Sequence, residues 1–236
     1  MRRNGYSAAY RSFEGSLQRA THLYRLERRL YSDPPAASDQ AAVEALRGGA
    51  SVLLVASLES YLRDALAEYI DLIAVYAMKT THIKLPIHLA HTNDLNFINW
   101  LIRDGRMEKQ AKIIEIQRVS ALIANSRFVP ESFNRTRANP GPDTVKTLLK
   151  EIGINNPLAT IEARLPSHYP QPFAGGFVET NLRTIVGRRN DVAHGSSSLS
   201  ISRLDLKNWI EFMQALGKSI DNVVRDHCFV IIAGLK

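Results

Sequence analysis

The stretch that decides the fold reads ASVLLVASLESYLRDALAEYIDLI at residues 50–73. Its apolar residues recur at three- and four-residue intervals, which is the spacing of one face of an α-helix. That face carries Val55, Glu59, Leu62, Leu66, Tyr69 and Ile73. The pattern predicts a long core helix that begins near Ser38 and reaches about Lys79. Gly48-Gly49 weakens the middle of this helix and would let another backbone approach closely.

Helical patterns continue on both sides of this stretch. Residues 6–31 keep the spacing of an amphipathic helix, which the Ser-Asp-Pro-Pro sequence at residues 32–35 ends. Further helices are expected at residues 94–104, 107–125, 142–153, 178–193 and 203–232. The last of them opens on Ser202-Arg203-Leu204-Asp205, which resembles a capping box. Residues 127–143 and 153–176 are rich in turn-forming residues and are expected to be irregular.

No stretch shows a convincing pair of strands, and neither an internal repeat nor a domain linker is visible. We therefore predict a single all-α domain over residues 1–236, with long antiparallel helices, short additional helices and irregular loops. Its core is expected at about residues 38–232, and residues 1–37 form an N-terminal helix and loop. The hydrophobic content of 45% is ample for such a core.

A second informative stretch reads GRRNDVAHG at residues 187–195. On a helix with about 100° per residue, Arg189 falls in the middle of an apolar stripe that includes Leu182 and Ile185. A second stripe beside it carries Arg183, Gly187, Asn190 and His194. A guanidinium on an apolar face is costly unless it is paired or lies in a solvated cleft. The pattern therefore predicts a specific role for Arg189.

Glu59 is a carboxylate on an apolar face, as Arg189 is a cation on one. The two opposite charges suggest a buried or cleft-lining pair. Such a pair has two interpretations: a salt bridge that only fixes the register of the helices, or a support that orients Arg189 for function.

His194 has three interpretations. It can complement the carbonyl end of a helix, it can bind a metal, or it can transfer protons near neutral pH. No His, Asp, Glu or Cys lies three or four residues after it, so metal binding has no support from the spacing. Cleavage of RNA without metal needs a base, an acid and a cation that stabilises the phosphorane. His194 and Arg189 can fill these roles, and Asn190 can bind phosphate or position the histidine.

The motif Arg189-Asn190-x-x-x-His194 resembles the R-x(4–6)-H signature of HEPN domains. Residues 50–62, 150–154 and 205–210 are similar to the elements of the RiboL-PSP-type HEPN proteins, so the resemblance covers roughly residues 40–230. It implies a HEPN-like helical bundle and a metal-independent endoribonuclease without cofactors. It also implies an active site that forms when two HEPN helices face each other in a homodimer. The alternative is a non-catalytic HEPN module that binds a protein partner, a nucleotide or RNA.

The formal net charge of +7 is compatible with RNA as a partner. Arg188 also lies within the signature spacing from His194, but Asn190 directly follows Arg189, which favours Arg189 as the motif arginine. Arg188 and Arg183 are then expected to bind RNA. Prokaryotic defence systems and toxins masked by an antitoxin or another regulatory protein are the contexts that the resemblance suggests.

Cys228 is the single cysteine, so no internal disulfide can form, which is typical of a reducing cytoplasm. No secretory signal is recognisable, and the charges at Glu59, Arg63 and Asp64 argue against a membrane span in the apolar stretch. His82, His88 and His91 lie close together in the sequence, but their spacing matches no known metal-ligand pattern. We therefore expect no bound metal.

Overall fold

The computed structural model describes residues 5–76, 87–125, 129, 139–194 and 201–233, and of residues 87–94 the helical backbone alone. These residues form helices joined by turns and contain no strand, which confirms the predicted all-α class. The elements are α1 (Ala8–Leu30), η1 (Ala37–Asp39), α2 (Gln40–Tyr76), α3 (Ile87–Arg103), α4 (Lys109–Ala124), α5 (Pro142–Glu151), α6 (Pro157–Arg164), η4 (Leu165–Ser167), α7 (Phe177–Ala193) and α8 (Arg203–Ala233).

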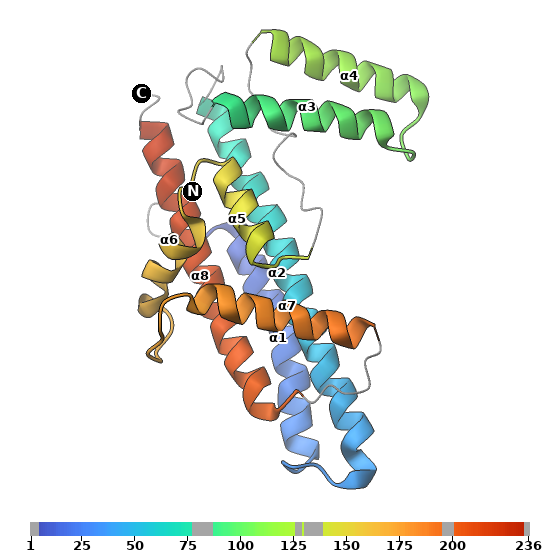
Figure 1. The fold of residues 1–236 in the computed structure, drawn as a ribbon, viewed down its shortest axis with the longest axis vertical. Coiled ribbons are helices and arrows are strands. Elements are labelled where there is room, and N and C mark those ends of the chain that lie inside the picture. The colour runs from blue at the N-terminus through green and yellow to red at the C-terminus, as the bar shows by residue number, and fades with distance from the viewer. Residues whose placement is uncertain (1–4, 77–86, 126–128, 130–138, 195–200, 234–236) are drawn as a thin grey trace.

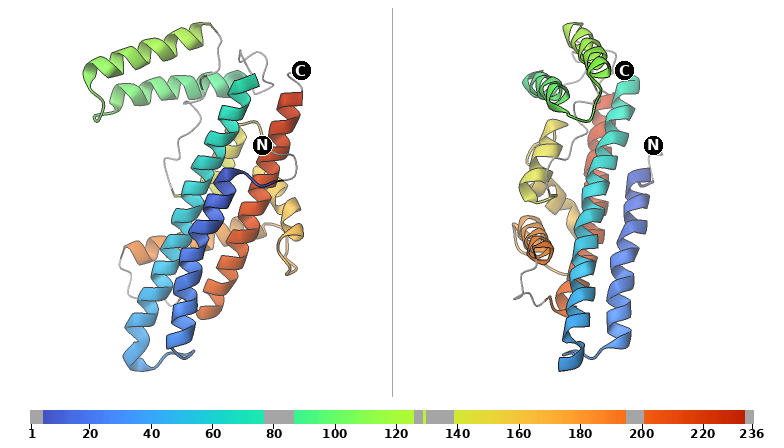
Figure 2. Two further views of the ribbon diagram at one scale, coloured as in Figure 1. Left: turned by 180° about the vertical axis from the view of Figure 1, so that it is seen from behind. Right: turned by 90° about the vertical axis from the view of Figure 1, so that its right-hand side faces the viewer.

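The long helices α1, α2 and α8 lie side by side and form the body of the fold (Figure 1). α1 runs antiparallel to both α2 and α8. Helices α5 and α7 cover one face of the layer made by α2 and α8, and α1 covers the opposite face (Figure 2). Because α2 is enclosed by α1, α7 and α8, its apolar residues face different neighbours around most of its circumference.

Helices α3 and α4 form a hairpin that projects from the end of α2 (Figure 1). The hairpin has a small hydrophobic cluster of its own, separate from the main core. The buried members of that cluster are Phe97, Leu101, Val119 and Val129. Its packing therefore contributes to the hairpin itself rather than to the three-helix body.

The first turn of α1 is tied to the two other long helices. Ser7 caps α1 by accepting a hydrogen bond from the backbone N–H of Tyr10 at 2.9 Å. Glu68 of α2 accepts the N–H groups of Ala8 and Ala9 at 3.3 and 3.1 Å. Asp221 of α8 accepts hydrogen bonds from both the backbone N–H and the hydroxyl of Ser7. Two carboxylates thus lie at the positive end of the α1 dipole.

A buried ionic network joins the opposite end of the body. Glu27 of α1 is 0% exposed, and its carboxylate accepts from Arg47 Nη2 at 2.6 Å and from Arg203 Nε at 2.9 Å. Arg47 also reaches Asp33, at 3.1 Å. The network fixes the end of α1, the second turn of α2 and the start of α8 to one another. A carboxylate buried this completely is tolerated because both of its oxygens are bonded to cations.

Several predicted boundaries differ from the structure. α3 begins at Ile87 rather than near Asp94, directly after a proline, a residue that commonly precedes or begins a helix. α6 occupies part of the stretch predicted to be irregular, because Pro157 starts a helix and Leu158 and Ile161 are buried on one face. Ser38 does not cap α2, since it lies within η1.

Other predictions are confirmed. Ser202 and Asp205 form a reciprocal capping box at the start of α8, with N–H donors at 3.1 and 3.0 Å from the side chains. By length and composition alone, the segment Ala37–Tyr76 is apolar enough to cross a membrane. Half of its most apolar part is buried inside the fold. That this segment does not span a membrane stays a prediction.

Candidate active site on helix α7

Helix α7 carries the motif and crosses both α2 and α8 (Figure 1). Its fully buried side chains are Val178, Leu182 and Ile185, which point into the main core. Glu162 of α6 caps its first turn by accepting the N–H groups of Gly176 and Val178, both at 2.9 Å. The core face and the cap together fix the helix so that its other side can carry function.

The far end of α7 is held by residues 47 and 48 of α2. A methyl group added to Gly48 would lie 3.1 Å from Val192 Cγ1, so α7 approaches α2 closely at this glycine. Arg47 Nη1 donates a hydrogen bond to the carbonyl of Ile201 at 3.1 Å. Gly48 and Arg47 therefore position Val192 and Ile201, which lie before and after the segment that follows His194.

The guanidinium of Arg189 is held by two amide side chains. Arg189 Nη1 donates to Asn139 Oδ1 at 2.8 Å and to Asn190 Oδ1 at 3.2 Å. The triangle closes with a hydrogen bond of 2.9 Å from Asn139 Nδ2 to Asn190 Oδ1. Both partners are neutral, so the positive charge of Arg189 is oriented but not cancelled.

Arg189 is half-buried, in agreement with its predicted place on an apolar stripe. Its Nε is fully buried and has no hydrogen-bond partner among the described residues. A buried donor without a partner costs about 1–3 kcal/mol of stability.

Asn190 and His194 face more open surroundings. Asn190 Oδ1 already accepts two hydrogen bonds, while its Nδ2 group makes none within the part of the chain that the structure describes. His194 is exposed and ends the helix, where its backbone N–H donates to the carbonyl of Asn190 at 3.0 Å. The amide donor and the imidazole are therefore both available to a ligand.

The two arginines predicted to bind RNA differ in their surroundings. Arg188 is exposed and makes no ion pair with any described residue. Arg183 is also exposed, but its Nη2 lies 2.8 Å from Glu179 Oε1, and Glu179 also pairs with Lys146 at 3.2 Å. Arg188 is thus the freer cation, because an RNA phosphate would have to compete with Glu179 for Arg183.

Glu59 is half-buried on α2. No ion pair or hydrogen bond joins it to Arg189 among the described residues, and Arg189 bonds the two asparagines instead. The pair predicted from their opposite charges is absent from this structure. The supporting role of Glu59 stays a prediction.

Asn139 is the site residue that sequence reasoning missed. It stands in the sequence Asn-Pro-Gly-Pro at residues 139–142, which predicts a turn and the start of a helix but no side-chain role. It lies 50 residues before Arg189. The turn itself could have indicated the residue, because it fixes the backbone of Asn139 next to the start of a helix.

Arg189 and His194 do not converge on one side of α7. Five positions on an α-helix correspond to about 140° around the axis and about 7.5 Å along it. Asn190 and His194, four positions apart, differ by about 40° and share a side. One copy of α7 therefore presents the imidazole and the guanidinium in different directions.

No group of three or more His, Cys, Asp or Glu residues that could hold a metal ion exists among the described residues. His82 lies outside the described residues. His88 and His91 belong to the first turns of α3, where the side chains are not described. The expectation that this histidine group binds no metal therefore stays a prediction.

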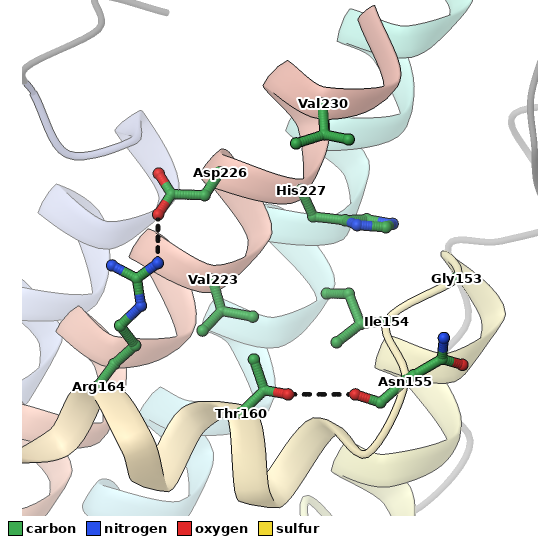
Figure 3. A pocket seen from close by; sticks show the side chains of 9 residues that line it. All are labelled: Gly153, Ile154, Asn155, Thr160, Arg164, Val223, Asp226, His227 and Val230. Carbon is green, nitrogen blue, oxygen red and sulfur yellow. Dashed lines mark hydrogen bonds and ion pairs between the residues drawn. The ribbon is translucent and has the colours of Figure 1, made fainter. Parts of the chain in front are cut away.

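A cavity of about 360 Å³ lies far from the motif, between α8, α6 and the turn before α6 (Figure 3). Arg164 and Asp226 form an ion pair of 3.0 Å at its edge. His227 Nε2 lies 2.8 Å from the carbonyl oxygen of Ile152, to which it donates its proton. Since these polar groups bond one another, the cavity has no unpaired charge with which to select a ligand.

Comparison with known proteins identifies the family of the chain. The family model described as RiboL-PSP-HEPN matches residues 21–226, which include helices α2 to α7 and the whole motif. No curated protein and no solved structure matches the chain. Because the matched region spans most of the sequence and the fold is all-α, the chain belongs to the RiboL-PSP-HEPN family.

Proposed function

We propose that this protein is a metal-independent endoribonuclease whose active site is built from Arg189, Asn190 and His194. The observation that carries the proposal is the environment of Arg189, whose guanidinium is held by neutral amides instead of a carboxylate. A cation that keeps its full charge next to a free amide donor, on a helix that also carries an exposed imidazole, is suited to a phosphorane dianion.

The reaction begins with attack of the ribose 2′-oxygen on the adjacent phosphorus. The bond between phosphorus and the 5′-oxygen then breaks, which leaves a 2′,3′-cyclic phosphate and a 5′-hydroxyl. One imidazole takes the proton of the 2′-hydroxyl and another donates a proton to the departing 5′-oxygen. Arg189 stabilises the negative charge that develops on the phosphorane, and Asn190 Nδ2 donates a hydrogen bond to one of its oxygens.

Two copies of α7 would supply both imidazoles. In a single copy Arg189 and His194 point about 140° apart, so a facing helix is needed to bring a guanidinium and an imidazole together. Gly187 lies on the same stripe as Asn190 and His194, and a methyl group added there would meet no atom within 4 Å. That open space at a glycine is where a partner helix can approach. We therefore propose a homodimer that pairs through α7.

RNA is the proposed substrate. The net charge of +7 and Arg188, which has no ion pair among the described residues, support its binding. A role as a toxin or effector in prokaryotic defence, and control by an antitoxin or another regulatory protein, are further proposals that follow from the family. The proposed location is the cytoplasm, because RNA substrates and a reduced Cys228 both fit that compartment.

The test is to incubate purified protein with end-labelled tRNA and mRNA, with and without EDTA. Cleavage should persist in EDTA and should leave cyclic or 3′-phosphate ends. His194→Ala and Arg189→Ala should each lower the rate about a hundredfold or more, the scale for removing a proton-transfer or charge-stabilising group. His22→Ala is the matched control, because His22 is exposed on α1. Helix α1 lies on the opposite side of the α2–α8 layer from α7 (Figure 2).

Cleavage that needs Mg²⁺ and survives His194→Ala would contradict the proposal. Tight binding of RNA without any cleavage would instead support the alternative of a non-catalytic HEPN module.

A further inference from the structure

Asn139 lies outside the sequence motif and is the residue through which the motif side chains are fixed to the rest of the protein. Its Oδ1 accepts from Arg189 Nη1 at 2.8 Å, and its Nδ2 donates to Asn190 Oδ1 at 2.9 Å. One amide therefore uses both of its ends on two consecutive residues of α7. No other described side chain contacts both Arg189 and Asn190 through hydrogen bonds.

The backbone of Asn139 is anchored independently of α7. Its carbonyl oxygen accepts from the N–H of Gly141 at 2.7 Å and from Thr144 Oγ1 at 2.8 Å. The flanking Pro140 is buried, and Pro142 begins α5. Because α5 packs into the core, the side chain of Asn139 starts from a fixed point.

An ion pair of 3.2 Å between Lys146 of α5 and Glu179 in the first turn of α7 also holds the two helices together. The amide contact of Asn139 is thus not the only link between α5 and α7. Loss of the amide should leave the helices in place while it frees the guanidinium. This separation makes a positioning role distinguishable from a structural one.

The chemistry of the contact favours a role in function. Other arginines with low exposure, such as Arg47 and Arg203, pair with the carboxylates of Glu27 and Asp33, which offset their charge. Arg189 bonds an amide, which is an acceptor without a net charge. The Nδ2 group of Asn139 donates to Asn190 Oδ1, so the oxygen of Asn190 points toward Asn139. The Nδ2 group of Asn190 is then left for a ligand.

We propose that Asn139 is a positioning residue for the ribonuclease reaction. It aims the guanidinium of Arg189, keeps its charge uncancelled and sets the orientation of the Asn190 amide. The proposal rests on the proposed function, and it adds that the active site depends on a residue of the turn before α5.

The first experiment compares Asn139→Ala and Asn139→Asp in single-turnover cleavage at saturating RNA. Asn139→Ala should slow cleavage about tenfold to hundredfold, the range for one hydrogen bond to a charged group, with little change in RNA affinity. Asn139→Asp keeps an acceptor for Arg189 and should protect stability, yet it should slow cleavage at least as much, because it cancels the charge. A structural role alone predicts that Asp restores the rate.

Asn222→Ala is the matched control. Asn222 Oδ1 accepts from Arg225 Nη2 at 2.8 Å on α8, a bond of the same type and length away from α7. This variant should cleave at the wild-type rate. In an Arg189→Ala background, Asn139→Ala should slow cleavage by a smaller factor than it does in the wild type, because the part of its effect that acts through Arg189 is already lost and only the part that acts through Asn190 remains. Wild-type rates in Asn139→Ala, or full rescue by Asp, would overturn the proposal.

A second experiment needs no substrate and so separates this proposal from the proposed function. In proton–nitrogen NMR spectra, the Nε–H signal of Arg189, identified by its loss in Arg189→Lys, should be protected from exchange with water because Nε is fully buried. Asn139→Ala should speed this exchange, whereas Asn222→Ala should not. An unchanged signal in Asn139→Ala would refute the positioning role even if wild-type protein cleaves RNA.

Discussion

Val192 of α7 lies over Gly48 of α2, where a methyl group added to the glycine would lie 3.1 Å from Val192 Cγ1. The end of the motif helix is therefore placed by the absence of a side chain on the core helix. His194, at the end of α7, follows Val192 by two residues.

Gly48→Leu should consequently displace the end of α7 and lower the free energy of unfolding by about 1–3 kcal/mol, the usual cost of overpacking. In a Val192→Ala background the loss should be smaller, with a coupling of about 0.5 kcal/mol or more. Urea denaturation of the four proteins measures both quantities. Gly15→Leu is the control, because a methyl group at Gly15 in α1 meets no atom within 4 Å. Equal losses for Gly48→Leu in both backgrounds would contradict the contact.

Gly187 and Gly217 are two helical glycines with opposite surroundings. A methyl group at Gly217 would lie 2.3 Å from Phe13 Cε1, whereas one at Gly187 would meet nothing within 4 Å. Gly217→Ala should cost about 1–3 kcal/mol of stability. Gly187→Ala should stabilise the monomer by up to about 1 kcal/mol through helix propensity, yet weaken the dimer if a partner helix approaches there.

Thermal unfolding and analytical ultracentrifugation of these two alanine variants provide the measurement. A Gly187→Ala protein that dimerises as well as the wild type would place the dimer contact elsewhere.

Arg188 and Arg183 should contribute unequally to RNA binding. Arg188 has no ion pair among the described residues, whereas Arg183 is paired with Glu179 at 2.8 Å. Arg188→Ala should weaken binding and reduce the slope of log K against log salt by about one unit, as expected for one lost phosphate contact. Arg183→Ala should weaken binding and reduce the salt slope by less than Arg188→Ala does. Binding isotherms at several salt concentrations test this, and equal slopes for both variants would contradict it.

His168 should make stability depend on pH. Burial, together with the nearby Lys218, lowers the pKa of His168 below its usual value of 6.5. Asn222 also favours the neutral imidazole of His168. Because Asn222 Oδ1 accepts a hydrogen bond from Arg225, its Nδ2 group is the one that faces His168 Nε2, at 3.0 Å. Nδ2 is a donor, so His168 Nε2 must accept and cannot carry a proton. The unfolded chain therefore binds a proton more readily than the folded one.

The contribution of His168 is present above pH 6.5 and is lost as the pH falls through the lowered pKa. The urea midpoint should fall less between pH 7.5 and pH 5.0 in His168→Gln than in the wild type, because glutamine supplies an acceptor that does not become protonated. Identical pH dependence in the two proteins would exclude this role.

Glu27 should be among the most sensitive positions for stability. It is 0% exposed and bonds Arg47 and Arg203. Glu27→Gln would leave Arg47 and Arg203 to share Asp33 as a counter-charge and should cost about 3–5 kcal/mol. Glu211→Gln is the comparison, since its pair with Lys207 at 3.6 Å is solvent-accessible and should contribute less than about 1 kcal/mol. Similar denaturation midpoints for the two variants would contradict the buried network.

Local patterns in the sequence were sufficient for most of the helices. The apolar spacing of residues 50–73 predicted the core helix α2, and the Ser202–Asp205 box marked the start of α8. These features depend on residues within one or two turns, so periodicity and capping reveal them. α6 was not predicted, because the prolines around it indicate an irregular segment. A helix of eight residues is also too short to be stable without packing against its neighbours.

The sequence by itself also pointed to the candidate site, since an arginine, an asparagine and a histidine stand together on α7. Only the tertiary structure decided what holds the arginine. Charge complementarity favoured Glu59 as its partner, but the packing of α5 against α7 brings Asn139 to Arg189 across 50 residues of sequence. A neutral amide avoids the cost of desolvating a second charge. Contacts of this kind depend on the relative positions of helices, which no periodicity within one helix records.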